Sequence, residues 1–449
     1  MASVVDDRAS GAEAPYTLDE PAPRVLGFWD QAAFWGNLGV SLFAFSGAYT
    51  VLAPDEAGRP TLSIVAGIVA MAVGTALGGL MLGLAAVPGA RTGQPAMVLL
   101  RGLFGARPSY APTVLNVAQL VGWGTFELIV IADAARALWG GVPRWGYVVA
   151  AGVLTTVLTL WPLGSVRVLR RYVTAAVLVA LVYFYVQLLR EPLPDLTAGS
   201  WSGFGVGADA ALAVSISWVP VAADYTRHAR SSKAAFGAAA VGYSLTQIVA
   251  YVLGLLALAL VAGDSSKVFD PFLHVTLGAV FFAVFVLREA DQSFANVYST
   301  AVSIQNLVPR ADRRVLTLAL GAGVTVLALV LDIGDYAGFL SLIGSVFVPM
   351  LGVLAADFFL GRGRRGWDTG RNAPARWGMI AAWAAGVAVY QLVYPGAAGW
   401  WTDLWTRAQE ALHFTPQSWM SASLLSFLAA GLAALAAGRI GGRRADAPH

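Results

Sequence analysis

Twelve long apolar runs, separated by short charged or Pro- and Gly-rich loops, constrain this chain more than any other feature of its sequence. A helix needs about 20 mostly apolar residues to cross about 30 Å of hydrocarbon. The runs lie at 31–53, 61–87, 111–139, 146–163, 172–189, 209–227, 235–262, 272–305, 314–332, 336–360, 377–395 and 418–438. They stay apolar over whole segments such as 255–261 instead of alternating as a membrane β-strand does. The sequence therefore predicts an all-α integral membrane protein with twelve transmembrane helices.

The composition agrees with this prediction and excludes several classes of protein. Only 12% of the residues are charged and 57% are hydrophobic, whereas soluble proteins carry about a quarter charged residues. A net charge of +3 provides no nucleic-acid-binding surface. There is no cysteine, so disulfides and thiolate chemistry are excluded. Neither a P-loop nor a His–carboxylate motif occurs, and we expect no cofactor and no enzymatic activity.

Basic residues alternate from loop to loop and thereby predict the orientation. Most of the 29 Lys and Arg residues lie in the two terminal tails and in the loops that follow even-numbered runs. The opposite loops hold only Arg59, Arg136, Arg144, Arg190, Lys267 and Arg407. By the positive-inside rule, both termini are cytoplasmic in a multi-pass protein of the cell membrane. Residues 1–30 lack the pattern of a signal peptide and are expected to form a disordered cytoplasmic tail, and residues 439–449 a second tail.

Two of the predicted spans contain strong helix breakers. Residues 34–41 in the first span read FWGNLGVS, and residues 215–220 in the sixth read SISWVP. Pro220 cannot donate a backbone hydrogen bond and clashes with the preceding turn. In secondary transporters, discontinuous helices at matching positions of two inverted repeats build the substrate site. Glycines also serve close helix packing, but breakers in spans one and six fit two inverted repeats of five spans.

A polar face in the third span predicts a binding surface for a flat ring. Gln119, Trp123 and Glu127 follow one another at intervals of four residues and so share one side of a helix. The indole offers a stacking surface, and the amide and carboxyl groups offer hydrogen bonds. The alternative is that Trp123 packs in the bundle and Glu127 pairs with an arginine.

The eighth span carries three charged residues within four positions, Arg288, Glu289 and Asp291, followed by Gln292 and Asn296. Charged groups inside a membrane are costly and are candidates for a transport pathway. Asp291 could ligate a hard cation or carry a coupling proton, and Arg288 could simply pair with it. Asp224 and Asp357, at the cytoplasmic ends of spans six and ten, are instead expected to form gate or fold-locking ion pairs.

Four motifs together resemble nucleobase–cation symporter family one, which includes cytosine, hydantoin, allantoin and purine permeases. They are 119–123, 217–227 with its Ser-Trp-Val-Pro and Asp-Tyr-Thr-Arg elements, 296–306, and 348–357. Their form is most similar to the hydroxymethylpyrimidine permease branch. The resemblance implies a leucine-transporter type fold with five plus five inverted helices and two extra helices. The transporter domain would span 31–438, with repeats at about 31–189 and 209–360 and the extra helices at about 377–438.

The resemblance also implies roles for individual residues. Trp123 corresponds to an aromatic that stacks on the substrate, and Glu127 and Asn296 to residues that hydrogen-bond it. Trp218 lies near the second stacking aromatic, with Ser217 beside it, and Gln119 completes the predicted set.

A cation site implied by the resemblance would use the Gly39 and Leu42 carbonyls together with span eight. There, Ala290 and Asp291 stand where hydantoin-type members carry Ser-Thr, so the coupling ion is left open between Na⁺ and H⁺.

The predicted function is import of a small planar N-heterocycle, led by hydroxymethylpyrimidine, by a cation-coupled symporter that uses alternating access. Cytosine, another nucleobase, hydantoin or allantoin is the alternative substrate. A channel or a membrane-embedded enzyme is the rival class, but neither a ring of charges nor a nucleophile–base set is evident. The expected partners are the small-molecule substrate and the lipid bilayer, without nucleic acid, for a monomeric protein.

Overall fold

The computed structural model describes residues 14–55, 58–164, 172–331, 336–396, 399–417 and 419–445. Every named element within these ranges is a helix. Strand-like pairing there is limited to two isolated bridges, between Leu26 and Ala229 and between Leu62 and Ser200. The predicted all-helical class is confirmed.

Helices cover all twelve predicted spans. In the first half they are α1 (Phe28–Gly39), α2 (Leu42–Ser46), α3 (Ala48–Val51), α4 (Ile64–Thr92), α5 (Ala96–Phe104), α6 (Tyr110–Trp139), α7 (Arg144–Leu160) and α9 (Thr174–Leu188). In the second half they are α10 (Phe204–Ile216), η3 (Val219–Val221), α11 (Ala222–Thr226), α12 (Ser232–Gly237), η4 (Ala238–Tyr243), α13 (Ser244–Leu260), η5 (Ser265–Lys267), α14 (Asp270–His274), α15 (Gly278–Leu307), α16 (Arg313–Val330), α17 (Tyr336–Ala355) and η6 (Ala356–Leu360). The C-terminal part holds η7 (Arg362–Arg365), α18 (Trp377–Val393), α19 (Gly399–Ala411) and α20 (Ala422–Ala445).

Length and composition alone identify fewer membrane helices than predicted. Seven helices in the described ranges are long and apolar enough to cross a membrane. Helices α7, α9 and α18 are apolar but shorter, α15 is long but carries the charged face predicted above, and the first span is divided into short helices. The count of twelve transmembrane helices therefore stays a prediction.

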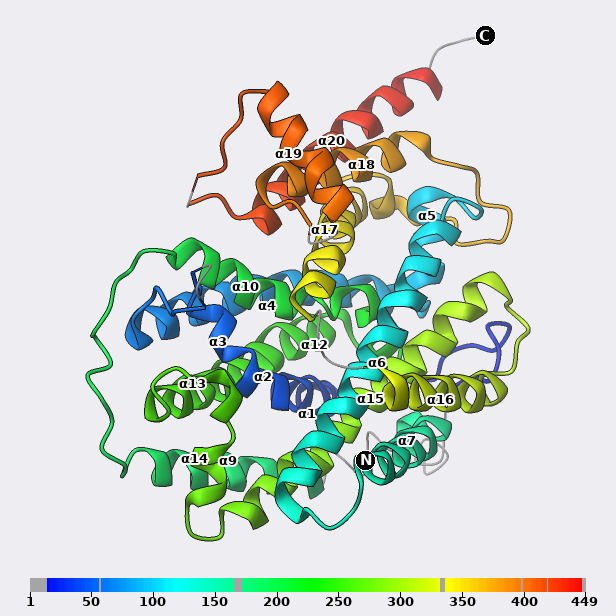
Figure 1. Ribbon diagram of the computed structural model, residues 1–449. Coiled ribbons are helices and arrows are strands. Elements are labelled where there is room, and N and C mark those ends of the chain that lie inside the picture. The colour runs from blue at the N-terminus through cyan, green and yellow to red at the C-terminus, as the bar shows by residue number, and fades with distance from the viewer. Residues whose placement is uncertain are drawn as a thin grey trace, which may run out of the picture.

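The helices pack in two groups and a C-terminal pair (Figure 1). In the first group α4 lies against α10, α11, α12 and α13, while α1 lies against η4 and α13. In the second group α6 packs on α15 and α7 packs on α16. Helices α18 and α20 pack on each other and on α17. Spans one, two, six and seven thus form one bundle, and spans three, four, eight and nine form the other.

Close packing in the first bundle depends on small residues of α4. A Cβ atom added at Gly74 would stand 2.0 Å from the Ala208 carbonyl oxygen of α10, and one added at Gly78 would stand 2.6 Å from Ser215 Cβ. Because such contacts are impossible, only glycine allows the two backbones to approach this closely.

Both predicted helix breaks are present. After α1 the backbone is extended at Val40 (φ −99°, ψ 110°), and Ser41 begins α2 by accepting a hydrogen bond from the Phe43 amide at 3.0 Å. Helix α10 ends at Ile216, and the chain continues through Ser217 and Trp218 into the 3₁₀ turn η3, which contains Pro220. The breaks expose backbone groups that another part of the protein must satisfy.

The described part of the N-terminal tail packs against the bundle, contrary to the expected disorder. The Leu26 amide donates to the His228 carbonyl at 2.9 Å, and the Arg230 amide donates to the Leu26 carbonyl at 2.9 Å. Arg313 lies over the ring of Tyr16, with its guanidinium carbon 5.7 Å from the ring centroid. The segment from Ala14 onward is therefore held against the ends of spans six and nine, while residues 1–13 lie outside the described residues.

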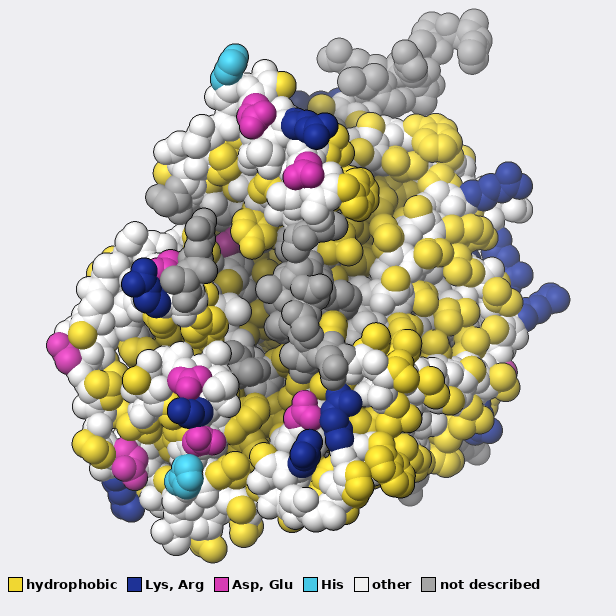
Figure 2. Space-filling view, in the orientation of Figure 1, with side chains coloured by type: hydrophobic (Ala, Val, Ile, Leu, Met, Phe, Trp, Pro, Cys, Tyr) yellow, Lys and Arg dark blue, Asp and Glu magenta, His cyan; other side chains and the backbone are white. Residues whose placement is uncertain are grey.

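The surface has the pattern of a membrane protein. Figure 2 shows hydrophobic side chains over the half of this face that carries α6, α15 and α16, and basic side chains along its right-hand edge. Exposed apolar residues of α16 include Val315, Val326 and Val330. An exposed apolar belt next to a basic edge is suited to hydrocarbon and to the membrane surface.

Candidate functional site

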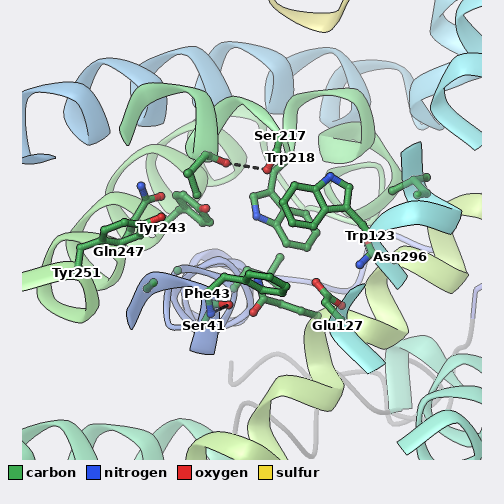
Figure 3. Close-up of a pocket in the computed structure, with 16 residues that line it drawn as sticks. Ser41, Phe43, Trp123, Glu127, Ser217, Trp218, Tyr243, Gln247, Tyr251 and Asn296 are labelled. Carbon is green, nitrogen blue, oxygen red and sulfur yellow. Dashed lines mark hydrogen bonds between the residues drawn. The ribbon is translucent and has the colours of Figure 1, made fainter. Parts of the chain in front are cut away.

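The two helix breaks meet at one buried pocket between the bundles (Figure 3). Its wall is built from α1 and α2, the α10 break, α6, α13 with the preceding π-turn, and α15. The predicted residues that line it are Gly39, Trp123, Glu127, Ser217, Trp218 and Asn296. The structure thus brings together residues that lie far apart in the sequence but were predicted to form one site.

Aromatic side chains form the walls of this pocket. Trp123 of α6 and Trp218 of the α10 break point toward each other in Figure 3. Both are at least nine-tenths buried. The ring of Phe43, on α2, stands edge-on to Trp123 with the centroids 5.9 Å apart. An arrangement of indole and phenyl faces around a small space favours a flat aromatic ligand.

Glu127 and Asn296 form the polar end of the pocket, where α6 packs on α15 (Figure 3). Their relative exposures are 2% and 3%. Within the described ranges neither Glu127 Oε2 nor Asn296 Nδ2 makes a hydrogen bond of acceptable geometry. Buried polar atoms with incomplete hydrogen bonding are costly in a protein interior, and these two side chains lie beside each other on the wall of the pocket.

Ser217 lines the pocket but uses its hydroxyl locally. Its Oγ donates to the Val214 carbonyl at 2.7 Å, the bond drawn as a dashed line in Figure 3. This bond satisfies a carbonyl near the end of α10. The Ser217 side chain therefore stabilises the backbone at the end of α10, next to Trp218.

Gln119 is the predicted substrate-binding residue that does not line the pocket. It donates through Nε2 to Asn116 Oδ1 at 2.7 Å, and Asn116 Nδ2 donates to Ser303 Oγ at 2.9 Å. Gln119 thus belongs to a polar chain that ties α6 to α15.

Span seven contributes residues that the sequence analysis missed. Tyr243, Gln247 and Tyr251 line the pocket at intervals of four residues, the same spacing as in the third span. Gln247 is held by hydrogen bonds from Ser215 Oγ to its Oε1 and from its own Nε2 to Thr75 Oγ1, both at 3.0 Å. The recurrence of side chains with polar groups every four residues could have revealed this face. Aromatic residues in an apolar span, however, are usually interpreted as residues that pack against other helices.

Around the predicted cation site, the break of span one contacts charged residues of span eight. The Leu42 amide and Ser41 Oγ both donate to the Glu289 carboxylate, at 3.0 and 2.7 Å. Arg288 donates to the Asn37 carbonyl at the end of α1. The side chain of Asp291 lies outside the described residues. In the part of the chain that is described, no cluster of three or more His, Asp or Glu side chains forms a metal site.

One of the two predicted boundary ion pairs is present. Asp357 forms a two-pronged pair with Arg376, with Nη2 to Oδ1 at 2.7 Å and Nη1 to Oδ2 at 2.8 Å. Asp224 instead accepts the Ala96 amide at 2.8 Å at the start of α5. Asp357 therefore ties span ten to the C-terminal helices, and Asp224 ties span six to the α4–α5 connection.

The pocket is contracted in this structure. Its cavity volume of about 30 Å³ is enough for only a few water molecules. Binding of a heterocycle is expected to require that the aromatic walls move apart. Movement between the two bundles would open such a space, because each bundle contributes one of the facing tryptophans.

A buried pocket at the breaks of two discontinuous membrane helices defines a class of protein, the secondary transporters. Residues 21–400 match the family described as permease for cytosine/purines, uracil, thiamine, allantoin. The chain belongs to this family, and the predicted family is thereby confirmed.

Similar proteins include two characterised permeases. The cytosine permease of Escherichia coli (strain K12) is 25% identical over 331 residues, covering 71% of this chain and 76% of that protein. The hydantoin permease of Microbacterium maritypicum is 25% identical over 381 residues, covering 77% and 75%.

Solved transporter structures share the fold. Mhp1, a nucleobase-cation-symport-1 family transporter in a closed conformation with bromovinylhydantoin bound, matches with a TM-score of 0.73 at 19% identity, covering 97% of this chain and 96% of that one. A Na⁺-coupled sialic acid symporter matches with a TM-score of 0.61 at 13% identity, covering 97% and 93%. The leucine-transporter type fold implied by the resemblance is confirmed.

Proposed function

We propose that this protein imports a small planar N-heterocycle across the cell membrane by alternating access, coupled to a cation. The observation that carries the proposal is the convergence of Trp123, Trp218, Glu127 and Asn296 on one buried space at the two helix breaks. Stacking surfaces on opposite sides and hydrogen-bonding groups at one end suit a flat ring with polar edges. Membership of the permease family supports this class of substrate.

A pyrimidine with an exocyclic amine, such as hydroxymethylpyrimidine, is the leading substrate. The Glu127 carboxylate can accept a hydrogen bond from the amine, and the Asn296 amide can both donate and accept. Hydrogen bonds to an ionised partner are stronger than neutral ones, so an ionised Glu127 favours a ring that presents an N–H donor.

Cytosine, another nucleobase, and hydantoin or allantoin are the alternative substrates. Cytosine presents the same amine and ring-nitrogen edge, and the similarity to a cytosine permease supports it. Hydantoin presents an imide N–H between two carbonyl groups, and the similarity to a hydantoin permease supports that alternative. The carboxylate of Glu127 favours the amine-bearing rings.

Transport would proceed by movement of the bundle of spans one, two, six and seven against the bundle of spans three, four, eight and nine. Phe43 and Trp218 belong to the first bundle, whereas Trp123, Glu127 and Asn296 belong to the second. Relative movement would therefore open and close the ring site. We further propose cytoplasmic termini, a cell-membrane location and a monomeric state, with Na⁺ or H⁺ as the coupling ion.

Uptake of labelled heterocycles into proteoliposomes tests the proposal. We expect uptake of a 4-aminopyrimidine or cytosine to exceed that into protein-free vesicles and to be inhibited by the unlabelled ring. A thermal-shift screen of pyrimidines, purines and hydantoins identifies the class, because a ligand that binds the folded state raises its melting temperature. Absence of both binding and uptake for all three classes would refute the proposal.

A further inference from the structure

Arg288 and Glu289 form a fully buried ion pair directly beside the break of span one. Arg288 Nη1 and Glu289 Oε2 are 3.2 Å apart, and both side chains are 0% exposed. Both residues lie on α15, in the second bundle, but each also makes a hydrogen bond to the first bundle. A buried pair of this kind is costly unless its hydrogen bonds are satisfied.

Each charge faces the helix end of opposite polarity. The Arg288 guanidinium donates through Nη2 to the Asn37 carbonyl, in the last turn of α1, where the helix dipole is negative. The Glu289 carboxylate accepts the Leu42 amide at 3.0 Å and Ser41 Oγ at 2.7 Å, where α2 begins and its dipole is positive. The ion pair therefore neutralises both helix ends that the break creates.

Gln292 provides a further acceptor for the arginine. Its Oε1 accepts from Arg288 Nη1 at 2.8 Å, and the Asn37 side chain is engaged separately with Thr174 Oγ1 at 2.8 Å. Asn37 O also accepts the Val40 amide at 3.1 Å. The Asn37 carbonyl oxygen, one of those in the last turn of α1 that a coupling cation could approach, thus already has two donors, one of them a permanent cation.

In secondary transporters, carbonyl groups at the C-terminal end of a half-helix commonly bind the coupling ion. We infer that the Arg288 guanidinium is a built-in substitute for Na⁺ at the break of span one, so that substrate binding and transport by this protein are independent of Na⁺. The inference rests on the proposed function. Of the two coupling ions proposed there, it excludes Na⁺ and leaves H⁺. A Na⁺ ion at this carbonyl would have to displace the Arg288 guanidinium, which already donates to it and pairs with Glu289.

Wild-type protein provides the first test, in buffers of equal ionic strength with 150 mM Na⁺, K⁺ or choline, on the order of physiological salt. We expect ligand-free protein to have the same melting temperature in all three buffers, and ring affinity and uptake to agree within about twofold. A rise in melting temperature with Na⁺ alone, or a tenfold gain in affinity or uptake, would overturn the inference. If no ring binds in any buffer, the proposed function fails, but the ligand-free melting curves still decide the role of Na⁺.

Arg288→Ala provides the second test, with Arg288→Lys as the matched control. Removal of the guanidinium leaves the Glu289 carboxylate and the Asn37 carbonyl, which are hard oxygen donors. We expect R288A to lose at least tenfold in ring affinity in choline and to recover in Na⁺, whereas R288K stays independent of Na⁺. A folded R288A whose affinity does not respond to Na⁺ would identify the ion pair as purely structural. If R288A does not fold, the wild-type result stands as the decisive measurement.

Discussion

The indole of Trp123 stands edge-on to the phenyl ring of Phe43, with the ring centroids 5.9 Å apart and the planes at 89°. These residues belong to different bundles, α6 and α2, so the contact joins the two parts that are proposed to move. Edge-to-face pairs contribute about 0.5–1.5 kcal/mol beyond the area they bury. The contact therefore holds the indole face in position toward the pocket.

Trp123→Ala is expected to weaken binding of the ring at least tenfold, because both the stacking surface and the fixed wall of the pocket are removed. Trp123→Phe should retain part of the affinity. Isothermal titration or thermal shift with the best ring measures the effect, and Trp377→Ala, at a surface indole that is 70% exposed, is the matched control. Full affinity in the folded W123A protein would refute the stacking role.

Glu127→Gln is expected to change selectivity between rings more than it changes folding. The substitution keeps the size of the side chain and one acceptor oxygen but removes the negative charge, so a hydrogen bond that contributes about 1.5–3 kcal/mol is replaced by a neutral one that contributes about 0.5–1.5 kcal/mol. Affinity for a 4-aminopyrimidine should fall on the order of fivefold, while affinity for the 4-oxo analogue changes little. Competition binding of the two rings measures the ratio, and equal losses for both would contradict the assigned role.

The spacing rules predicted part of the site and missed the rest for identifiable reasons. Trp123 and Glu127 lie one turn apart on α6, and both line the pocket. Each step of four residues turns an α-helix about 40° past a full circle and advances about 6 Å. On α6 the pocket is lined by Leu120, seven residues before Glu127, and not by Gln119, eight residues before it, and Gln119 contacts Asn116 instead.

Other parts of the structure depend on tertiary contacts that no local pattern contains. The partner of Arg288 is a backbone carbonyl, Asn37 O, which becomes available only because the helix ends nearby. Likewise, the sequence showed that charges lie in span eight and that span one is broken, but not that the two features meet. The packing of Ala14 to Leu26 against the bundle was missed for the same reason.

Gly39→Ala is expected to abolish transport and to destabilise the fold. A Cβ atom there would lie 2.2 Å from Thr246 Oγ1, 2.6 Å from the Tyr243 carbonyl oxygen and 2.9 Å from the Gln247 amide nitrogen. Because two of these atoms belong to the backbone, the helix break must move away from span seven. Gly323→Ala, where no atom lies within 4 Å, is the control and should retain uptake and melting temperature. Normal uptake by G39A would contradict the close packing of the break.

Asp357→Asn is expected to lower the stability of the protein strongly. Asp357 is paired with Arg376, and their side chains are only 2% and 14% exposed. Removing one member of a buried pair costs about 3–5 kcal/mol, because the other charge loses its partner. Asp55→Asn breaks the pair with Arg59, which is 78% exposed, and should cost less than about 1 kcal/mol. Melting temperatures of the two variants measure the difference, and equal values would contradict the assignment.

His228 is expected to make the protein less stable in acid. It follows the end of span six, where Arg227 Nε donates to its Nε2 at 3.2 Å and its Nδ1 faces the Pro23 carbonyl at 3.0 Å. Burial and the neighbouring Arg227 lower the pKa of His228 to about 3. The folded state therefore resists protonation that the unfolded state accepts below a pKa of about 6.5. Stability is complete above that value and is lost as the pH falls toward 3, by about 2 kcal/mol at pH 5.

His228→Gln tests this dependence, because a glutamine keeps one donor and one acceptor but does not titrate. The drop in melting temperature between pH 7.5 and pH 5 should be about 2 °C smaller in H228Q than in the wild type. His274 and His413 are present in both proteins, so their contribution cancels in the comparison. Parallel pH profiles of the two proteins would show that the buried imidazole is not the source of the acid sensitivity. A flatter profile for H228Q would tie that sensitivity to the contact between the N-terminal segment and the end of span six.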